Sequence, residues 1–397
     1  MRILMLAQSC TPIGVGQRGH VRNLSIGLAR RGNDVAVATT GQPGSKTGQT
    51  EDGVTSERQQ VPRPPTISVI ICAYTEDRWE LMLQSVASVQ EQTLQPCEII
   101  VCIDHNETLF HRCAAYWAHF AASTPPIRVI QNKYDGHLGS ARNTAAEIAA
   151  GDILAFLDDD AAADKDWLGI LTDPYQDERI GAVGGRPIPV FKAGRPAWFP
   201  VQFDWVFGCA YDGLPTSRGP LAHLIGANMS VRRTLLEQVG GFHSDNHDDM
   251  DMCHRVAHIK GSEAVIYEPA ATVRHFVPAS RPTWKYFWRR CFFVNKGKVE
   301  AFAQMGDAAT LGAEARFVWY ALTKGVPRGI SQAAKGDAHG LARSAAIIAG
   351  VGLAAAGHVA GRIELARRLR RQGQQGTKQM LDTAAQPVGE GSKCRLR

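Results

Sequence analysis

Three features of secreted or nucleic-acid-binding proteins are missing from this sequence. Its nine cysteines form no Cys-x-x-Cys pair, and Cys72 and Cys102 lie in apolar runs, as buried thiols of a reducing compartment do. The first apolar run, residues 1–7, is too short for a signal peptide. No basic stripe with interleaved aromatic residues occurs, which argues against a nucleic-acid partner. We therefore expect a cytoplasmic protein.

What the sequence does have is an uneven distribution of positive charge. The formal net charge is +6 over 397 residues, and basic residues gather toward the C-terminus, with five arginines between Arg362 and Arg371. Such a cluster suits an anionic membrane surface or a phosphate-bearing ligand. The chain is 44% hydrophobic, which is enough for one large domain or two smaller ones.

Apolar patterning divides the chain into five parts. Residues 1–42 predict a β-α-β unit, with strands at 2–7 and 34–39 and a helix at 20–31. Residues 43–65, rich in Gly, Ser, Thr and Pro, predict a linker. A second α/β pattern occupies residues 66–300, followed by a helical region at 301–371 and a disordered tail at 372–397.

The second pattern alternates strands with helices. Strands are predicted at 67–73, 98–103, 127–131 and 153–158, separated by helices at 79–91, 107–122 and 139–150. This order implies a mainly parallel sheet flanked by helices, with right-handed crossovers. Shorter patterns predict further strands at 181–186 and 264–267 and helices at 235–238 and 250–258.

An acidic triplet, Asp158-Asp159-Asp160, directly follows the apolar run 153–157. Three adjacent carboxylates repel one another unless something neutralises them, and oxygen ligands of this kind suit Mg²⁺ or Mn²⁺. The carboxyl ends of parallel strands are also where ligands bind in such sheets. The triplet therefore predicts a metal site facing a phosphate; the alternative is a solvated acidic turn.

Several further motifs follow one another along the second pattern. In order they are Ala73-Tyr74, Asp104-His105-Asn106, Ser140-Ala141-Arg142-Asn143, the acidic triplet, Gly226-Ala227-Asn228-Met229, Gly240-Gly241-Phe242, Asp248-Asp249-Met250-Asp251 and Val277–Arg281. This order resembles the family-2 glycosyltransferases of GT-A fold, and within them enzymes similar to lipid-linked glucuronosyltransferases. Residues 1–42, in contrast, resemble the N-terminus of GT-B glycosyltransferases, without the half of that fold that binds the nucleotide.

The resemblance implies an α/β protein with a GT-A-type sheet and a definite reaction. The enzyme would be a metal-dependent, inverting glycosyltransferase that moves a sugar from a nucleoside diphosphate sugar, with UDP expected, to a hydroxyl of a lipid-linked or glycan acceptor. The sequence has no Gln-x-x-Arg-Trp motif of the processive synthases after Asp249, which favours one transfer per encounter. The alternatives are a nucleotidyltransferase on a similar sheet and a non-catalytic fused scaffold.

The donor side of the expected site comes from the strand ends. Tyr74 would stack on the base or serve as an ordinary rim aromatic, Asp104 would accept from the base, and Glu76 would assist. Arg142 would pair with phosphate oxygens or form a salt bridge to the acidic triplet. Asp158 and Asp159 would also lie on the donor side, with Asp159 the member whose role is least defined.

The metal and the proton acceptor involve four more residues. Asp160 would bind Mn²⁺ or Mg²⁺, with His275 either a further ligand or a structural histidine. Asp249, next to Asp248, would be the general base that takes the acceptor proton. At the start of a helix both acids could instead cap it, and the two roles can coexist.

Two segments indicate where the acceptor and the membrane would be bound. The Pro- and aromatic-rich segment 196–205 would shape the acceptor side or pack in the core. Residues 342–363 are almost uncharged but consist mostly of Ala and Gly, which insert weakly. We expect an interfacial helix and peripheral binding at the inner face of the cell membrane; a packed soluble tail and a true span are the alternatives.

Overall fold

The computed structural model describes residues 2–7, 34–39, 49–51, 54–56, 64–119, 124–243, 247–305 and 312–384. It divides into two units, Met1–Pro65 and Thr66–Arg397. In the first unit β1 (Arg2–Ala7) and β4 (Val54–Ser56) each pair in parallel with β2 (Asp34–Thr39), and β3 (Gln49–Glu51) pairs antiparallel with β4. Two short strands therefore fall in the range expected to be a linker, and the helix expected at 20–31 lies outside the described residues.

The second unit is built on a mixed sheet, in which the four strands that come first in the sequence are parallel to one another. Its strands run in the order β11-β13-β10-β12-β8-β5-β6-β7. The parallel half consists of β5 (Ile67–Ala73), β6 (Glu98–Ile103), β7 (Ile127–Gln131) and β8 (Ile153–Asp158). These bounds confirm the four strands predicted from the apolar runs, because each run is long enough to be buried on both faces of a sheet.

The other half of the sheet was only partly predicted. β12 (Asn228–Arg232) lies antiparallel between β8 and β10 (Ala182–Phe191), and β13 (Val265–Val277) runs parallel to β10. β13 is much longer than the strand expected at 264–267. A register shift opposite Gly184 and Arg186 accommodates Pro269 of this strand, which would otherwise interrupt the ladder. Two short strands, β9 (Ala161–Ala163) and β11 (Gly219–Pro220), also pair with β13.

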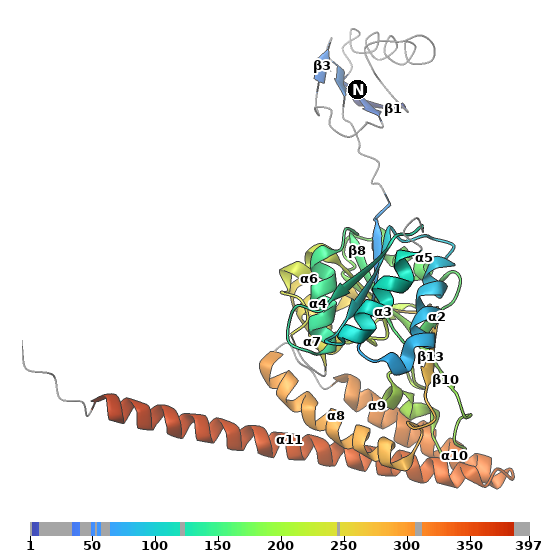
Figure 1. Cartoon of the computed structure of the whole chain (residues 1–397), viewed down its shortest axis with the longest axis vertical. Coiled ribbons are helices and arrows are strands. Elements are labelled where there is room, and N and C mark those ends of the chain that lie inside the picture. Colours follow the sequence, from blue (N-terminus) through green and yellow to red (C-terminus); the bar gives the residue numbers. More distant parts are fainter. Residues whose placement is uncertain are drawn as a thin grey trace, which may run out of the picture. The chain divides into compact units, whose positions relative to one another are not determined.

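Alternate residues of the central strands supply two separate cores. Val69 and Ile71 of β5 pack with the helices α2 (Trp79–Gln90), α3 (Glu107–Ala118) and α5 (Trp167–Thr172). Ile70 faces the opposite way, toward α4 (Leu138–Ile148), α6 (Arg233–Gln238) and α7 (Asp248–Lys260). This period-2 division places helices on both faces, as Figure 1 shows.

A third core joins the sheet unit to the C-terminal helices. These are α8 (Trp284–Met305), α9 (Gly312–Tyr320), the π-helical turn η6 (Ala321–Gly325), α10 (Val326–Ala334) and α11 (His339–Ala384). Phe199 and Phe203, the second from the 3-10 helix η3 (Val201–Phe207), pack there with Phe287 and Ile347. These two aromatics of segment 196–205 therefore serve core packing.

The C-terminal boundary differs from the expected one. α11 continues through the range expected to be a disordered tail as far as Ala384, while residues 385–397 lie outside the described residues. α8 runs from Trp284 to Met305 and so crosses the boundary expected between residues 300 and 301.

Candidate functional site

The acidic triplet lies at the carboxyl end of β8 and is largely buried. Asp158 is the last residue of the strand, and Asp159 and Asp160 are only 3% and 2% exposed. The alternative of a solvated acidic turn is therefore wrong. Burying carboxylates demands nearby cations, and the structure supplies them from three separate elements.

The first cation partner is His275, on β13. The chain leaves the triplet as β9, which pairs antiparallel with β13 so that Ala161 lies opposite His275. This pairing brings Nε2 of His275 within 2.9 Å of an Asp160 carboxylate oxygen and 3.9 Å of an Asp158 oxygen. Burial opposes protonation of the imidazole, but its hydrogen bonds with Asp160 and Cys209 outweigh burial and raise the pKa of His275 well above its usual range.

Asp158, Asp160 and His275 form a cluster that fits a divalent metal ion. One potential ligand atom from each lies within 4.8 Å of the other two. Two carboxylates and an imidazole are suitable ligands for a cation such as Mn²⁺. The other ring nitrogen of His275, Nδ1, lies 3.2 Å from the buried Cys209 Sγ, which leaves Nε2 directed at the carboxylates. This is the arrangement that orients a metal-binding imidazole.

The second cation partner, Arg78, was missed in the sequence. It ends the short 3-10 helix η1 (Glu76–Arg78), which follows β5, and its Nη1 lies 2.7 Å from Asp159 Oδ1 and 3.1 Å from Asp160 Oδ2. Burial raises the pKa of Asp159 to about 7, against the opposing effect of Arg78. The available signal was position alone: Arg78 is the first basic residue after the strand adjacent to β8.

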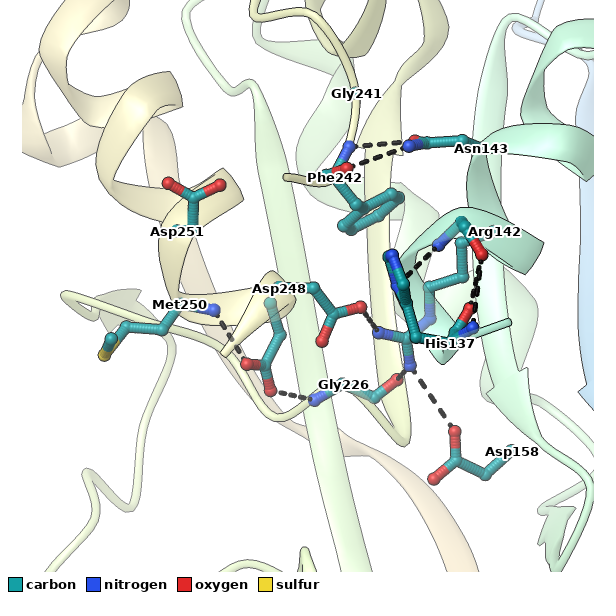
Figure 2. Close-up of polar contacts among 12 residues, drawn as sticks. His137, Arg142, Asn143, Asp158, Gly226, Gly241, Phe242, Asp248, Met250 and Asp251 are labelled. Carbon is teal, nitrogen blue, oxygen red and sulfur yellow. Dashed lines mark hydrogen bonds and ion pairs between the residues drawn. The ribbon is translucent and has the colours of Figure 1, made fainter. Parts of the chain in front are cut away.

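The third cation partner is Arg142, on α4, whose side chain is buried. Figure 2 shows its contacts with Asp158, Gly226 and Asp248. Its Nη2 lies 3.5 Å from Asp158 and donates to the Gly226 carbonyl at 2.8 Å, so the predicted salt bridge to the triplet is present. Its Nη1 also donates to Asp248 Oδ2 at 2.6 Å. Although burial opposes its charge, Asp248 and Asp158 raise the pKa of the guanidinium above its ordinary value. Arg142 thus ties the triplet to the start of α7.

Asp249 completes this side of the site from the first turn of α7. Its Oδ2 accepts from the backbone N–H of Gly226 at 2.9 Å, and its Oδ1 accepts from the N–H of Met250 at 2.7 Å. Asp249 therefore does satisfy a helix N–H, as the capping alternative states, while remaining half-buried beside Arg142. A Cβ on Gly226 would lie 3.0 Å from Arg142 and 3.1 Å from Asp249, so this close approach favours glycine.

The expected base-binding residues lie at neighbouring strand ends. Tyr74 follows β5 and is 57% exposed, which leaves its ring available for stacking. Asp104 follows β6 and accepts from the Asn132 side chain at 2.8 Å. Asn106 donates to the Tyr74 carbonyl and holds the two loops together. Glu76 is the exception, since it faces Arg112 of α3 at 3.9 Å.

Comparison with known proteins identifies the family to which this chain is similar. Residues 68–240 match the model of glycosyl transferase family 2. The chain is 30% identical over 242 residues to the glucosyl-dolichyl phosphate glucuronosyltransferase of Haloferax volcanii, covering 58% of this chain and 76% of that protein. It is 26% identical over 164 residues to a pre-mycofactocin glycosyltransferase of Mycobacterium tuberculosis, covering 39% and 33%.

Solved structures include a mannosyltransferase from Pyrobaculum calidifontis in complex with GDP-mannose and Mn²⁺. It superimposes with a TM-score of 0.47 at 18% identity, covering 74% of this chain and 88% of that one.

Proposed function

This chain belongs to glycosyl transferase family 2, and on that premise we propose that it is a metal-dependent, inverting, non-processive glycosyltransferase. It moves a sugar from a nucleoside diphosphate sugar, with UDP the expected nucleotide, to a hydroxyl of a lipid-linked or glycan acceptor. The observation that carries the proposal is the juxtaposition of Asp158, Asp160 and His275 with the Arg142–Asp248 pair and Asp249 at one edge of the sheet.

The donor is held at the ends of β5, β6 and β8. Tyr74 stacks on the base and Asp104 accepts from it, while the buried Arg142 acts through its ion pairs with Asp158 and Asp248. Asp158, Asp160 and His275 would hold Mn²⁺ or Mg²⁺, which supplies Lewis-acid stabilisation of the departing nucleoside diphosphate. Arg78 holds Asp159 and Asp160 in place through contacts of 2.7 and 3.1 Å.

The two acids that begin α7 divide their roles by their partners. Asp248 is buried and tied to Arg142 at 2.6 Å, so it anchors the site. Asp249 is less buried, and its oxygens are oriented by the N–H groups of Gly226 and Met250. As the acceptor oxygen attacks the anomeric carbon and the bond to the diphosphate breaks, Asp249 takes the hydroxyl proton.

The acceptor class would place the enzyme at a membrane. By its name, the Haloferax relative acts on a dolichyl-phosphate-linked glucose. In the described part of this chain, one helix segment, His339–Arg371, is long and apolar enough to span a bilayer. We assign the chain to the cytoplasm, bound peripherally to the inner face of the cell membrane.

Residues 1–42 are an appended unit without catalysis, so deletion of residues 1–60 should leave donor binding unchanged.

The experiment is a panel of nucleotide sugars tested with purified protein, first by thermal shift and then by transfer. A bound donor raises the melting temperature, because it stabilises the native state alone. We expect donor binding and release of nucleoside diphosphate that require Mn²⁺ or Mg²⁺ and stop with EDTA. Release of pyrophosphate instead would identify a nucleotidyltransferase. No binding of any donor with either metal would support a scaffold.

A further inference from the structure

The outward face of α11 is an uninterrupted apolar stripe. Between Arg343 and Arg362 the helix contains no Asp, Glu, Lys or Arg. Exposed residues recur every three or four positions: Leu341, Ala345, Ile348, Gly352, Ala355 and Val359. This spacing places them on one face, over roughly 27 Å of helix at 1.5 Å per residue. The three largest of these six side chains are each more than half exposed. We call these six residues the apolar stripe.

The opposite face of α11 is locked against its neighbours by glycines. A Cβ on Gly357 would lie 2.1 Å from the Phe292 carbonyl oxygen of α8, and one on Gly361 would lie 2.6 Å from the Lys296 carbonyl oxygen. Gly340 packs in the same way against Gly329 of α10. Contacts this close fix the rotation of α11 about its own axis. The apolar stripe therefore cannot turn inward to be buried.

Positive charge gathers at the end of the stripe. Lys296, Arg367, Arg368 and Arg371 line a groove of about 580 Å³ whose apolar wall includes Phe292 and Ile363. Glu364 lies in the same groove and pairs with Lys296 at 2.6 Å, and Arg368 pairs with Glu300 and lies 3.9 Å from Glu364. Arg370 is exposed beside them, and we call the five cations, Lys296, Arg367, Arg368, Arg370 and Arg371, the basic end.

We propose that the apolar stripe and the basic end together dock on an anionic phospholipid bilayer, with α11 lying flat in the headgroup region. Apolar side chains enter the acyl boundary, and the long arginine side chains reach lipid phosphates. The proposal deepens the proposed function, since a lipid-linked acceptor is presented at that surface. In Figure 1, α8 lies between α11 and the sheet. The stripe lies on the side of α11 opposite Gly357 and Gly361, which contact α8, so it faces away from α8.

The same contacts argue against α11 as a span. α8 is locked to α11 through Gly357 and Gly361, and it carries the exposed Lys285, Arg289 and Arg290. Crossing the bilayer would bring these charges into hydrocarbon or break the helix pair, and both are costly. A helix lying in the interface keeps the charges in water and the pair intact.

The test is flotation of the full chain with two kinds of vesicle, phosphatidylcholine alone and an equimolar mixture with phosphatidylglycerol. We expect binding to the anionic vesicles, weakened by salt. The variant Arg367→Gln/Arg370→Gln/Arg371→Gln should lose roughly 100-fold in affinity, from about a tenfold change for each 1.4 kcal/mol and about 1 kcal/mol for each cation. Its control, Lys165→Gln/Arg179→Gln/Lys192→Gln, removes as many exposed charges elsewhere and should bind normally.

A second pair of variants tests the stripe. Ile348→Asn/Val359→Asn should abolish flotation, whereas Leu94→Asn/Ile259→Asn, which alters two similarly exposed apolar residues of the sheet unit, should not. Equal binding to both vesicles, or no effect of either test variant, would overturn the proposal. Retention of the cellular protein in membranes after alkaline carbonate extraction would also overturn it, because that result identifies a span.

Thermal-shift binding of the donor should be unchanged in all four variants. Absence of donor binding by the unmodified chain would instead count against the proposed function, so failure of the membrane proposal can be distinguished from failure of the proposed function.

Discussion

Charged side chains are buried at the sheet edge but exposed on the α8–α11 helix pair. At the sheet edge, charges are drawn inward: Asp159, Asp160, His275 and Arg142 are all nearly inaccessible and neutralise one another. In the helix pair, Gly357 and Gly361 make close backbone contacts, while several cations and large apolar side chains of α11 stay exposed. The first arrangement suits a small charged ligand that replaces internal partners, and the second suits an extended surface.

The strongest test of the sheet edge is Asp160→Ala. Removing one carboxylate from the three-residue cluster should abolish both metal binding and metal-dependent transfer, because the leaving diphosphate loses its cation. Isothermal titration with Mn²⁺ and a transfer assay measure the two losses. The control is Glu178→Ala, an exposed acid elsewhere in the sheet unit, which should behave normally. Full activity of Asp160→Ala would refute the assigned metal site.

Asp249→Asn should reduce transfer by about 100- to 10,000-fold, the usual contribution of a general base. Its donor affinity should stay close to normal, because the amide oxygen can still accept from Gly226. Transfer rates and donor binding are measured separately.

Asp248→Asn is the informative comparison for this variant. It weakens the ion pair of a buried arginine and should lower the midpoint of unfolding as well as activity. If Asp249→Asn instead lost donor affinity in proportion to rate, Asp249 would not be the base.

Cys209→Ala should weaken Mn²⁺ binding by about 10-fold or more, as loss of a residue that orients a metal ligand commonly does. The physical reason is that Nδ1 of His275 loses its partner at 3.2 Å and the ring is no longer held toward Asp160. Free Mn²⁺ measured by electron paramagnetic resonance gives the affinity directly. Cys113→Ala removes a thiol that is equally buried but lies on α3, and it should leave Mn²⁺ affinity unchanged. Equal affinities of the two variants would exclude this role of Cys209.

In the helix pair, Gly357→Ala should cost about 1–3 kcal/mol of unfolding free energy, because the added methyl meets the Phe292 carbonyl oxygen. Gly352→Ala lies on the open face of the same helix, where nothing lies within 4 Å, and should stabilise by up to about 1 kcal/mol. Guanidinium unfolding compares the two. Similar effects would mean that α11 does not pack through Gly357.

Much of the parallel half of the sheet could be predicted from the sequence, because its strands are apolar runs bounded by polar loops. β12 was missed because Asn228 and Ser230, both fully buried, interrupt the apolar pattern. Asn228 is buried because it donates to the Ala271 carbonyl and accepts from Trp167, which are contacts between distant elements.

Contacts between residues distant in sequence also limited what could be predicted of the site. The acidic triplet, Arg142 and Asp249 stand in recognisable motifs, and the structure brings them together. Arg78 and Cys209 carry no motif. Arg78 reaches the triplet from η1, and Cys209, just after η3, reaches His275 of β13. Glu76, two residues from both Tyr74 and Arg78 in sequence, instead lies 3.9 Å from Arg112 of α3.

A glycine lies at one of the contacts between the two regions. Gly297 of α8 lies against His247, and a Cβ there would be 3.1 Å from the imidazole Nε2. His247 immediately precedes Asp248 and Asp249. A side chain at position 297 would therefore force α8 or the start of α7, which carries the proposed base, to shift by a few tenths of an ångström. The helix that carries part of the outer surface thus also contacts the segment that leads into the proposed base.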